Sequence, residues 1–215
     1  DMYNNLLICC FCGEEGATFL KNEILHAALR CPLCGEALAA VGASLVCGGV
    51  RRHTYDMARA GYVNLNTHLP QSGDTAEMAA ARQTFLRNGY YAPLADALTR
   101  LALAHAPGTS LLCDAGCGEG YYTEAVGEKF AAVLGADLSK YALALAGKRA
   151  KRAGLATKLF YAAASVYALP LADNTCDCVM SVFAPIAADE AFRVLKPGGI
   201  LLTAAAGRDH LTELK

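Results

Sequence analysis

Short apolar segments alternate with helical segments over the second half of this 215-residue chain. We expect strands at 110–115, 131–136, 157–163, 176–182 and 199–205, with helices between the first three and again at 189–195. Strands separated by helices usually form a parallel sheet, because each crossover helix packs back onto a face of that sheet. The sequence therefore predicts a doubly wound α/β fold.

A glycine-rich turn follows the first predicted strand. The strand ends at Asp114, and Gly116, Gly118 and Gly120 then occupy alternate positions before Tyr121. Glycine lets the backbone turn tightly and approach a ligand, and the following helix begins with unpaired N–H groups. A dinucleotide site would require glycine where Tyr121 stands. The spacing is instead typical of Rossmann-like methyltransferases, which bind S-adenosylmethionine.

A second carboxylate, Asp137, ends the next predicted strand. In nucleotide-binding α/β folds a carboxylate at this point accepts hydrogen bonds from the ribose hydroxyls. Asp137 could instead only cap the helix that begins near Ser139, and the sequence leaves both roles open. Farther along, 164–166 would border the adenine, and 196–199 would make the tight turn into the last strand.

Four potential zinc ligands precede this region: Cys31, Cys34, Cys47 and His53. A close Cys-x2-Cys pair followed by a second pair is typical of tetrahedral structural zinc sites. Segment 31–66 has only short apolar pieces, so a metal would have to supply its folding energy. Four metal-free thiol and imidazole side chains are the alternative. A closed set of four ligands predicts one structural zinc per chain.

The composition limits the remaining possibilities. The net charge of −1 does not by itself indicate a nucleic-acid binder. No apolar run approaches the roughly 18 residues of a membrane span, and the N-terminus lacks the features of a signal peptide. Ten cysteines in an apolar chain of this length fit reduced thiols in the cytoplasm better than disulfides. We expect Cys113, Cys117, Cys176 and Cys178 to act as small buried apolar residues.

Two helices are expected between the cysteine-rich segment and the sheet. Asp74, with Glu77 three residues later, resembles an N-cap, and the helix would end at Gly89. A second helix would start at Pro93 and end before Pro107. The apolar faces are predicted to contain Met78, Ala81, Phe85 and Leu86 in the first helix, and Leu94, Leu98, Leu101 and His105 in the second.

The motifs together resemble the RlmA-type 23S ribosomal RNA guanine-N1 methyltransferases, over residues 31–215. The resemblance rests on 31–34, 47–53, 55–65, 73–78, 81–86, 89–91, 116–122, 183–185, 195–199 and 207–215. It implies methyl transfer from S-adenosylmethionine to N1 of one guanine in a 23S rRNA hairpin loop, with the zinc module helping to recognise the RNA. It also implies cofactor contacts from four residues: Tyr91, Gly120, Tyr121 and His210. With the turn and strand-end residues, the predicted cofactor-binding set is Tyr91, Asp114, Gly116, Gly118, Glu119, Gly120, Tyr121, Asp137 and His210.

The sequence departs from this family in two places. The Cys47–His53 spacing is longer than the family pattern, so we expect a reshaped zinc loop. The chain also ends before the last two strands of a seven-stranded class I methyltransferase sheet. We therefore expect five strands and an uncovered edge at 199–205. Either the chain is a fragment, or another chain covers this edge by self-association, for example in a homodimer. The expected organisation is an N-terminal extension (1–30), a zinc-binding RNA-recognition module (31–66), a helical linker region (67–108) and a truncated methyltransferase domain (109–215).

The catalytic residues are not identified by any motif. Asp56 and Asp189 are possible general bases for removal of the N1 proton, although a structural role suits both. Tyr90, Tyr122 and Phe183 are candidates for stacking on a looped-out base. A basic run from Lys140 to Lys158 could contact phosphates or form a solvated helix face. Two other functions remain open: methylation of a small molecule, and a non-catalytic module that binds zinc and the cofactor.

Overall fold

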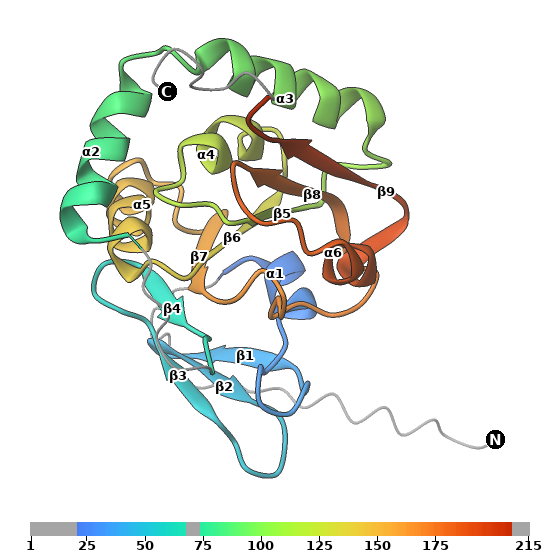
Figure 1. Cartoon of the computed structure of the whole chain (residues 1–215). Coiled ribbons are helices and arrows are strands. Elements are labelled where there is room, and N and C mark those ends of the chain that lie inside the picture. Colours follow the sequence, from blue (N-terminus) through green and yellow to red (C-terminus); the bar gives the residue numbers. More distant parts are fainter. Residues whose placement is uncertain (1–20, 68–73, 208–215) are drawn as a thin grey trace.

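The second half of the chain forms a parallel sheet covered by helices, as the alternation of elements predicts (Figure 1). The computed structural model describes residues 21–67 and 74–207. The five predicted strands are β5 (Leu111–Ala115), β6 (Ala132–Asp137), β7 (Leu159–Ala163), β8 (Cys176–Val182) and β9 (Leu195–Ala204). The first four are almost completely buried, because helices cover both of their faces. Strand β9 begins earlier than predicted, since helix α6 (Ala188–Val194) leads directly into it.

The helices divide the core into two layers, one on each face of the sheet. Helices α3 (Ala92–His105), α4 (Tyr121–Gly127) and α5 (Lys140–Arg152) pack on one face through residues such as Leu98, Val126 and Leu143. Helix α1 (Glu23–Ala28), α6 and the cysteine-rich module pack on the other. The four cysteines of the methyltransferase region, Cys113, Cys117, Cys176 and Cys178, are buried as predicted. No helix in the described residues is long and apolar enough to cross a membrane.

The cysteine-rich module contributes a strand to the main sheet, which the sequence did not predict. Strands β1 (Leu38–Val41), β2 (Ser44–Cys47) and β3 (Thr54–Asp56) form a small antiparallel sheet. The next strand, β4 (Tyr62–Asn64), instead pairs in parallel with β7. The main sheet therefore has the order β4-β7-β6-β5-β8-β9, with six strands instead of the five expected. The expected boundary at residue 66 separates residues that belong to one continuous sheet.

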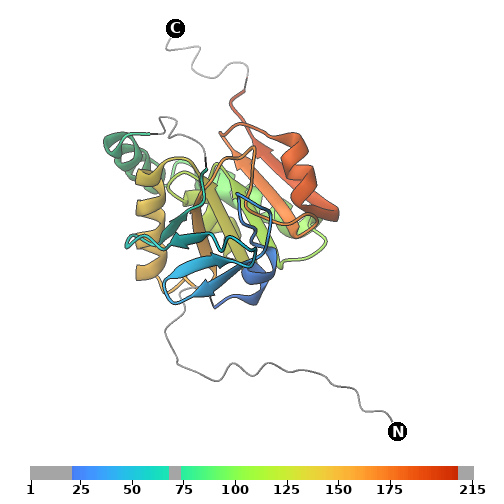
Figure 2. The same cartoon turned by 90° about the horizontal axis from the view of Figure 1, so that it is seen from below.

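Close backbone contacts fix this module against the rest of the protein (Figure 2). A Cβ atom on Gly147 of α5 would lie 2.5 Å from the carbonyl oxygen of Ala60, so only glycine fits at this contact. Lys151 Nζ donates to the carbonyl of Arg59 at 3.1 Å. On the other side, Leu29 forms a bridge with Leu171. Residues 22–29 of the expected N-terminal extension are thus part of the core, with Leu25 and Leu29 fully buried.

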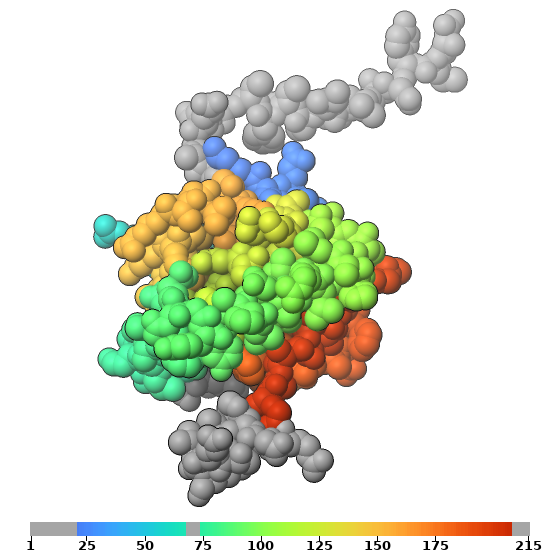
Figure 3. Space-filling model, turned by 90° about the horizontal axis from the view of Figure 1, so that it is seen from above, coloured from blue at the N-terminus to red at the C-terminus, as the bar shows by residue number. Residues whose placement is uncertain are grey.

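Helices α2 (Ala76–Arg87) and α3 follow one another along the surface of the molecule, and Figure 3 shows them as a green band. Helix α2 is capped by Thr75, whose hydroxyl accepts from the backbone N–H of Met78, so the expected cap at Asp74 is wrong by one residue. Its predicted apolar face is mostly exposed, and Ala79 alone is buried. In α3 the buried residues are Ala95, Leu98 and Ala102, not the predicted face through Leu101 and His105. The prediction is wrong for α2, where Ala79 makes the buried contact, and half right for α3, where Leu98 is buried and Leu94 packs against the core while Leu101 and His105 are exposed.

Strand β9 forms an edge of the sheet within the described residues, where it pairs only with β8. Its apolar residues Ile200, Leu201 and Leu202 are partly exposed, whereas the strands inside the sheet are buried. Strand β4 occupies the opposite edge. The cysteine-rich module therefore extends one edge of the sheet and leaves β9 at the other.

Candidate functional site

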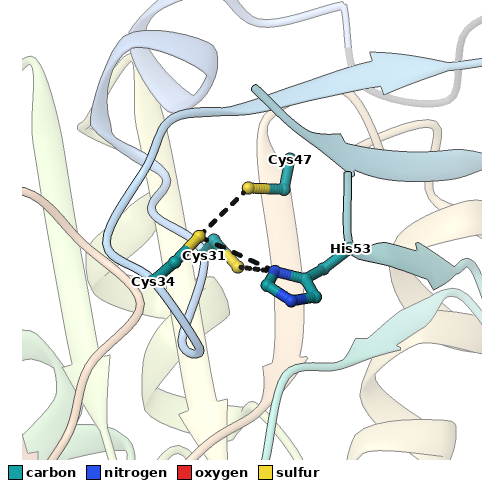
Figure 4. A group of neighbouring side chains, drawn as sticks. All are labelled: Cys31, Cys34, Cys47 and His53. Carbon is teal, nitrogen blue, oxygen red and sulfur yellow. Dashed lines mark hydrogen bonds between the residues drawn. The ribbon is translucent and has the colours of Figure 1, made fainter. Parts of the chain in front are cut away.

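The four predicted zinc ligands converge at one point (Figure 4). The sulfur atoms of Cys31, Cys34 and Cys47 and one ring nitrogen of His53 all lie within 4.8 Å of one another. The Cys34 and Cys47 sulfurs are 3.3 Å apart, and the Cys31 sulfur is 3.4 Å from His53 Nδ1. Three thiols and one imidazole at these separations fit a tetrahedral zinc ion with Zn–S bonds of about 2.3 Å.

Turns and strand ends hold these ligands in place. The turn after Cys31 is closed by the Gly35 N–H, which donates to the Cys31 carbonyl at 2.8 Å, and Gly35 adopts a φ of 77°. Cys47 ends β2 and His53 precedes β3, and the Cys47 N–H donates to the His53 carbonyl at 2.8 Å. This bond closes the loop between them, which is the part expected to be reshaped. The backbone brings the two halves of the site together.

Two hydrogen bonds to sulfur favour the thiolate form that a metal requires. The Tyr55 hydroxyl lies 3.1 Å from the Cys31 sulfur, and the Gly49 N–H donates to the Cys47 sulfur at 3.2 Å. Burial raises the pKa of Cys31, but the bonds from Tyr55 and from the backbone outweigh it and bring this pKa down to about 6. Tyr55 is thus a partner of the metal site that no spacing motif contains.

A cavity of about 810 Å³ opens beyond the carboxyl ends of β5 to β8. Ligands of open α/β sheets usually bind at this edge of the sheet, in pockets of roughly 300–1,000 Å³. Seven of the nine predicted cofactor residues line the cavity: Tyr91, Asp114, Gly116, Gly118, Glu119, Tyr121 and Asp137. Gly120 does not line it, and His210 lies outside the described residues. Ser165 and Val166, which were expected to border the adenine, also line the cavity.

The three glycines of the turn are required for different reasons, although all have positive φ. A Cβ on Gly116 would lie 2.3 Å from the Cβ of Ala184, so this glycine admits the loop after β8. A Cβ on Gly120 would lie 2.7 Å from the Tyr161 hydroxyl, behind the turn. A Cβ on Gly118 would meet no protein atom within 4 Å. Only Gly118 therefore combines a left-handed backbone with open space on the cavity side.

Asp137 connects the glycine turn to the end of β6. Its Oδ2 accepts from the Gly118 N–H at 2.9 Å, and its Oδ1 accepts from the Ser139 N–H at 2.7 Å. Burial raises the pKa of Asp137, while these two N–H donors lower it. Ser139 itself caps α5 with its hydroxyl, so Asp137 is not needed as the side-chain cap. Each carboxylate oxygen keeps a lone pair for a further donor.

Asp114 is almost fully buried at the end of β5. Its Oδ2 accepts from the Thr123 hydroxyl of α4 at 2.6 Å. Burial raises the pKa of Asp114 to about 7, the hydrogen bond from Thr123 opposes this, and the nearby Asp137 adds to it. A carboxyl group that changes charge near neutral pH thus lies at the floor of the cavity.

Buried polar atoms without protein partners face the same region. Glu119 is buried, and its Oε2 lies 2.8 Å from Arg149 Nη1. Its Oε1 and the hydroxyl of Tyr122 have no hydrogen-bond partner among the described residues, and both side chains line the cavity. Buried polar groups are rarely left unpaired. These two atoms are the ones that a polar ligand in the cavity could satisfy.

The basic run on α5 divides between two roles. Arg149 turns inward and pairs with Glu119 and Glu124. Lys151 and Lys158 donate to backbone carbonyls of neighbouring segments. The remaining members, Lys140, Lys148 and Arg152, are exposed. The run is therefore partly structural, which spacing alone did not indicate.

Other sequence candidates are placed differently by the structure. Neither Asp56 nor Asp189 lines the cavity, and Asp56 instead accepts from the Ser44 hydroxyl at 2.6 Å. Tyr122 and Phe183 line it, whereas Tyr90 does not. Sequence reasoning did not predict the contributions of Asn66, after β4, and of the Asp74–Arg82 ion pair, whose partners both line the cavity. Only the packing of α2 and β4 beside the glycine turn brings these residues to the cavity.

Comparison with protein families agrees with this division of the chain. Residues 29–70 match the family model described as "RlmA, N-terminal", a zinc ribbon, and residues 113–203 match a model described as "Methyltransferase domain". The first match contains all four metal ligands, and the second contains the glycine turn and Asp137 but not the cavity residues from Asn66 to Tyr91.

Curated relatives extend over most of the chain. A 23S rRNA (guanine(748)-N(1))-methyltransferase from Streptomyces fradiae is 38% identical over 202 residues, covering 90% of this chain and 68% of the relative. A protein from Micromonospora griseorubida, named within the 23S rRNA (guanine-N1)-methyltransferase class, is 39% identical over 207 residues, covering 86% of this chain and 68% of its own.

A solved structure supports the fold independently. A protein from Methanococcus maripaludis, described as an S-adenosylmethionine-dependent methyltransferase, superposes with a TM-score of 0.54 at 20% identity. The superposition covers 65% of this chain and 68% of the other. At this identity the likeness concerns the Rossmann-like sheet and its helices.

Proposed function

This chain belongs to the family of 23S rRNA (guanine-N1)-methyltransferases, and we propose that it methylates N1 of one guanine in a hairpin loop of 23S rRNA. The observation that carries the proposal is that the zinc ribbon and the methyltransferase domain share one sheet, so the metal site and the cofactor cavity are held in fixed positions relative to each other. Strand β4 of the zinc ribbon is an edge strand of the methyltransferase sheet, and Asn66 just beyond it lines the cofactor cavity. An RNA gripped by the ribbon would therefore lie beside the methyl donor.

The cavity residues suit S-adenosylmethionine. Asp137 is placed to accept from the ribose hydroxyls, and Ser165 and Val166 would border the adenine. Glu119 Oε1 could accept from the ammonium group of the amino-acid portion, because it is buried next to the turn and has no hydrogen-bond partner among the described residues. The Tyr122 hydroxyl is a second buried polar atom without a hydrogen-bond partner in the described part of the chain.

The bound cofactor would supply an electrophilic methyl group on a sulfonium. In the transfer, the bond from sulfur to the methyl carbon breaks, a bond from guanine N1 to that carbon forms, and the N1 proton leaves to water. The main task of the protein is to align nucleophile and methyl group. The rigid glycine turn, held by Asp137 and packed on Ala184, fixes one side of that line.

The zinc ribbon is proposed to position RNA and to take no part in the chemistry. All four ligands come from the protein, so the metal has no open position for a substrate. Arg51 and Arg52 are exposed in the loop between Cys47 and His53 and could meet phosphates. A ribosomal RNA substrate would place the reaction in the cytoplasm.

The test is methylation of a 23S rRNA transcript with labelled donor, followed by primer extension across the product. Methylation at N1 removes the Watson–Crick edge of guanine, so reverse transcription should stop at one position. Label without a stop would place the methyl group on another atom and contradict the N1 assignment. Transfer to small molecules with none to rRNA would contradict the RNA substrate.

A further inference from the structure

Phe183 has a backbone conformation that a bulky residue rarely adopts. Its φ is 53°, in the left-handed region that favours glycine. The Phe183 N–H donates to the carbonyl of Ala204 in β9 at 2.8 Å, which holds the loop after β8 in this conformation. Strained residues of this kind persist where the surroundings impose them, and they cluster at functional sites.

Burial of the Phe183 side chain contributes little free energy to offset this backbone strain. The residue is 52% exposed, and its ring contacts Tyr91 edge-to-face with centroids 6.0 Å apart. Both rings line the cofactor cavity, and both also line a second pocket of about 440 Å³ beside it. The other walls of that pocket are Ala184, Ala205 and Ala206. Phe183 thus stands between two adjoining spaces.

The position of this ring relative to the cofactor cavity is fixed by contacts with the glycine turn. Ala184, the next residue, packs so closely on Gly116 that a Cβ there would lie 2.3 Å away. Ser181 Oγ, on the other side, donates to the carbonyls of Ala184 and Pro185 at 3.4 Å. The loop that carries Phe183 is therefore braced against the turn that bounds the cofactor cavity.

We propose that the pocket formed by Tyr91, Phe183, Ala184, Ala205 and Ala206 receives the purine base to be methylated, with the Phe183 ring stacked on it. The proposal rests on the proposed function, because it assumes a base in single-stranded RNA that can leave its stack. Such bases are commonly bound between aromatic and apolar side chains. An exposed aromatic ring on a wall of small residues, next to the cofactor cavity, matches that requirement.

Replacement of Phe183 by glycine separates function from stability. Glycine adopts φ of 53° without strain, so Phe183→Gly should melt at the same temperature as the wild type or higher. Its affinity for S-adenosylhomocysteine should stay within about twofold, while kcat/KM for 23S rRNA falls at least about tenfold, as expected for a lost stacking contact. Phe183→Tyr, which keeps the ring, should retain most activity.

Several outcomes would overturn the assignment. Wild-type kcat/KM in Phe183→Gly would do so, and so would a loss of cofactor affinity that matches the loss of activity, since the ring would then belong to the cofactor site. If the wild-type protein does not methylate rRNA at all, the proposed function fails instead.

A binding measurement tests the pocket without catalysis. The chain contains no tryptophan, so Phe183→Trp would carry a single tryptophan, which can be excited selectively over the ten tyrosines. Addition of a single-stranded oligoribonucleotide that contains guanine should change the tryptophan emission of this variant in the presence of S-adenosylhomocysteine. Phe192→Trp is the control, because Phe192 is 70% exposed on α6 and lines neither pocket. Equal responses from the two variants, or none from Phe183→Trp, would refute a base site at Phe183.

Discussion

Replacing Asp114 by asparagine should stabilise the ligand-free protein relative to the wild type, and this advantage should grow as the pH rises. Burial raises the pKa of Asp114 to about 7 in the folded protein, whereas an unfolded aspartate has a pKa of about 3.9. Between these values the unfolded chain gives up its proton and the folded chain keeps it. Folding free energy is therefore lost from about pH 4 upward, and the loss is complete above about pH 7. Asparagine does not titrate and escapes this loss.

The size of the effect follows from the interval between the two pKa values. About three pH units at roughly 1.4 kcal/mol each give an upper value of about 4 kcal/mol at pH 8. Asparagine can still accept from Thr123, but its new N–H groups need partners, which would cost about 1–3 kcal/mol. The constant part of that cost cancels when two pH values are compared. The stability difference between Asp114→Asn and the wild type should grow by about 2–3 kcal/mol from pH 5 to pH 8.

Urea denaturation followed by circular dichroism, without ligand, measures this difference at both pH values. Asp177→Asn is the matched control, because Asp177 is also buried but its pKa is lowered, whereas that of Asp114 is raised. Burial raises the pKa of Asp177, yet Lys196 and the N–H groups of Leu111 and Ser110 outweigh it and leave this pKa lowered. Its contribution is fully present above the unfolded pKa and is lost only as the pH falls below about 4. Asp177→Asn should therefore destabilise the protein equally at both pH values.

A pH-independent difference for Asp114→Asn would refute the reasoning, since it would mean that Asp114 is ionised in the folded protein throughout this range. The variant should also bind S-adenosylhomocysteine differently from the wild type, because Asp114 lines the cavity. If Asp114 is retained for function and not for stability, Asp114→Asn should gain stability while its affinity for S-adenosylhomocysteine changes.

Four further predictions concern the metal site, the glycine turn and the sheet edge. Cys34→Ser should lose most of the one zinc per chain that elemental analysis finds in the wild type, and equal metal in both would disprove the ligand set. Tyr55→Phe should keep zinc but lower its affinity about 10-fold or more in chelator competition, because the hydrogen bond to Cys31 is lost; unchanged affinity would make Tyr55 a packing residue. Gly116→Ala should weaken S-adenosylhomocysteine binding at least about tenfold by calorimetry, since its Cβ meets Ala184. Gly89→Ala, with similar φ and no close atom, controls for backbone strain. Strand β9 has only one neighbouring strand among the described residues, and its free edge should cause self-association that light scattering detects; a concentration-independent monomer would contradict this.

The local chemistry of both sites could be predicted from the sequence. Ligand spacing in Cys31–Cys34 and Cys47–His53 is set by turns of a few residues, so the metal site is encoded locally. The alternation of strands and helices likewise predicts a parallel sheet, and it places the glycine turn directly after strand β5. Asp137 is predictable for the same reason, since it ends the neighbouring strand at the same edge of the sheet.

Only the tertiary structure decided how these parts meet. Strand β4 has three residues and no local signal, and it becomes a strand because β7 offers an unpaired edge. The inward turn of Arg149 depends on two carboxylates from α4 and the turn before it, which no helical periodicity reveals. The left-handed conformation of Phe183 depends on a hydrogen bond to β9, a strand that follows later in the chain. Spacing along a chain determines contacts across a turn, but contacts between distant segments require the whole sheet to form first.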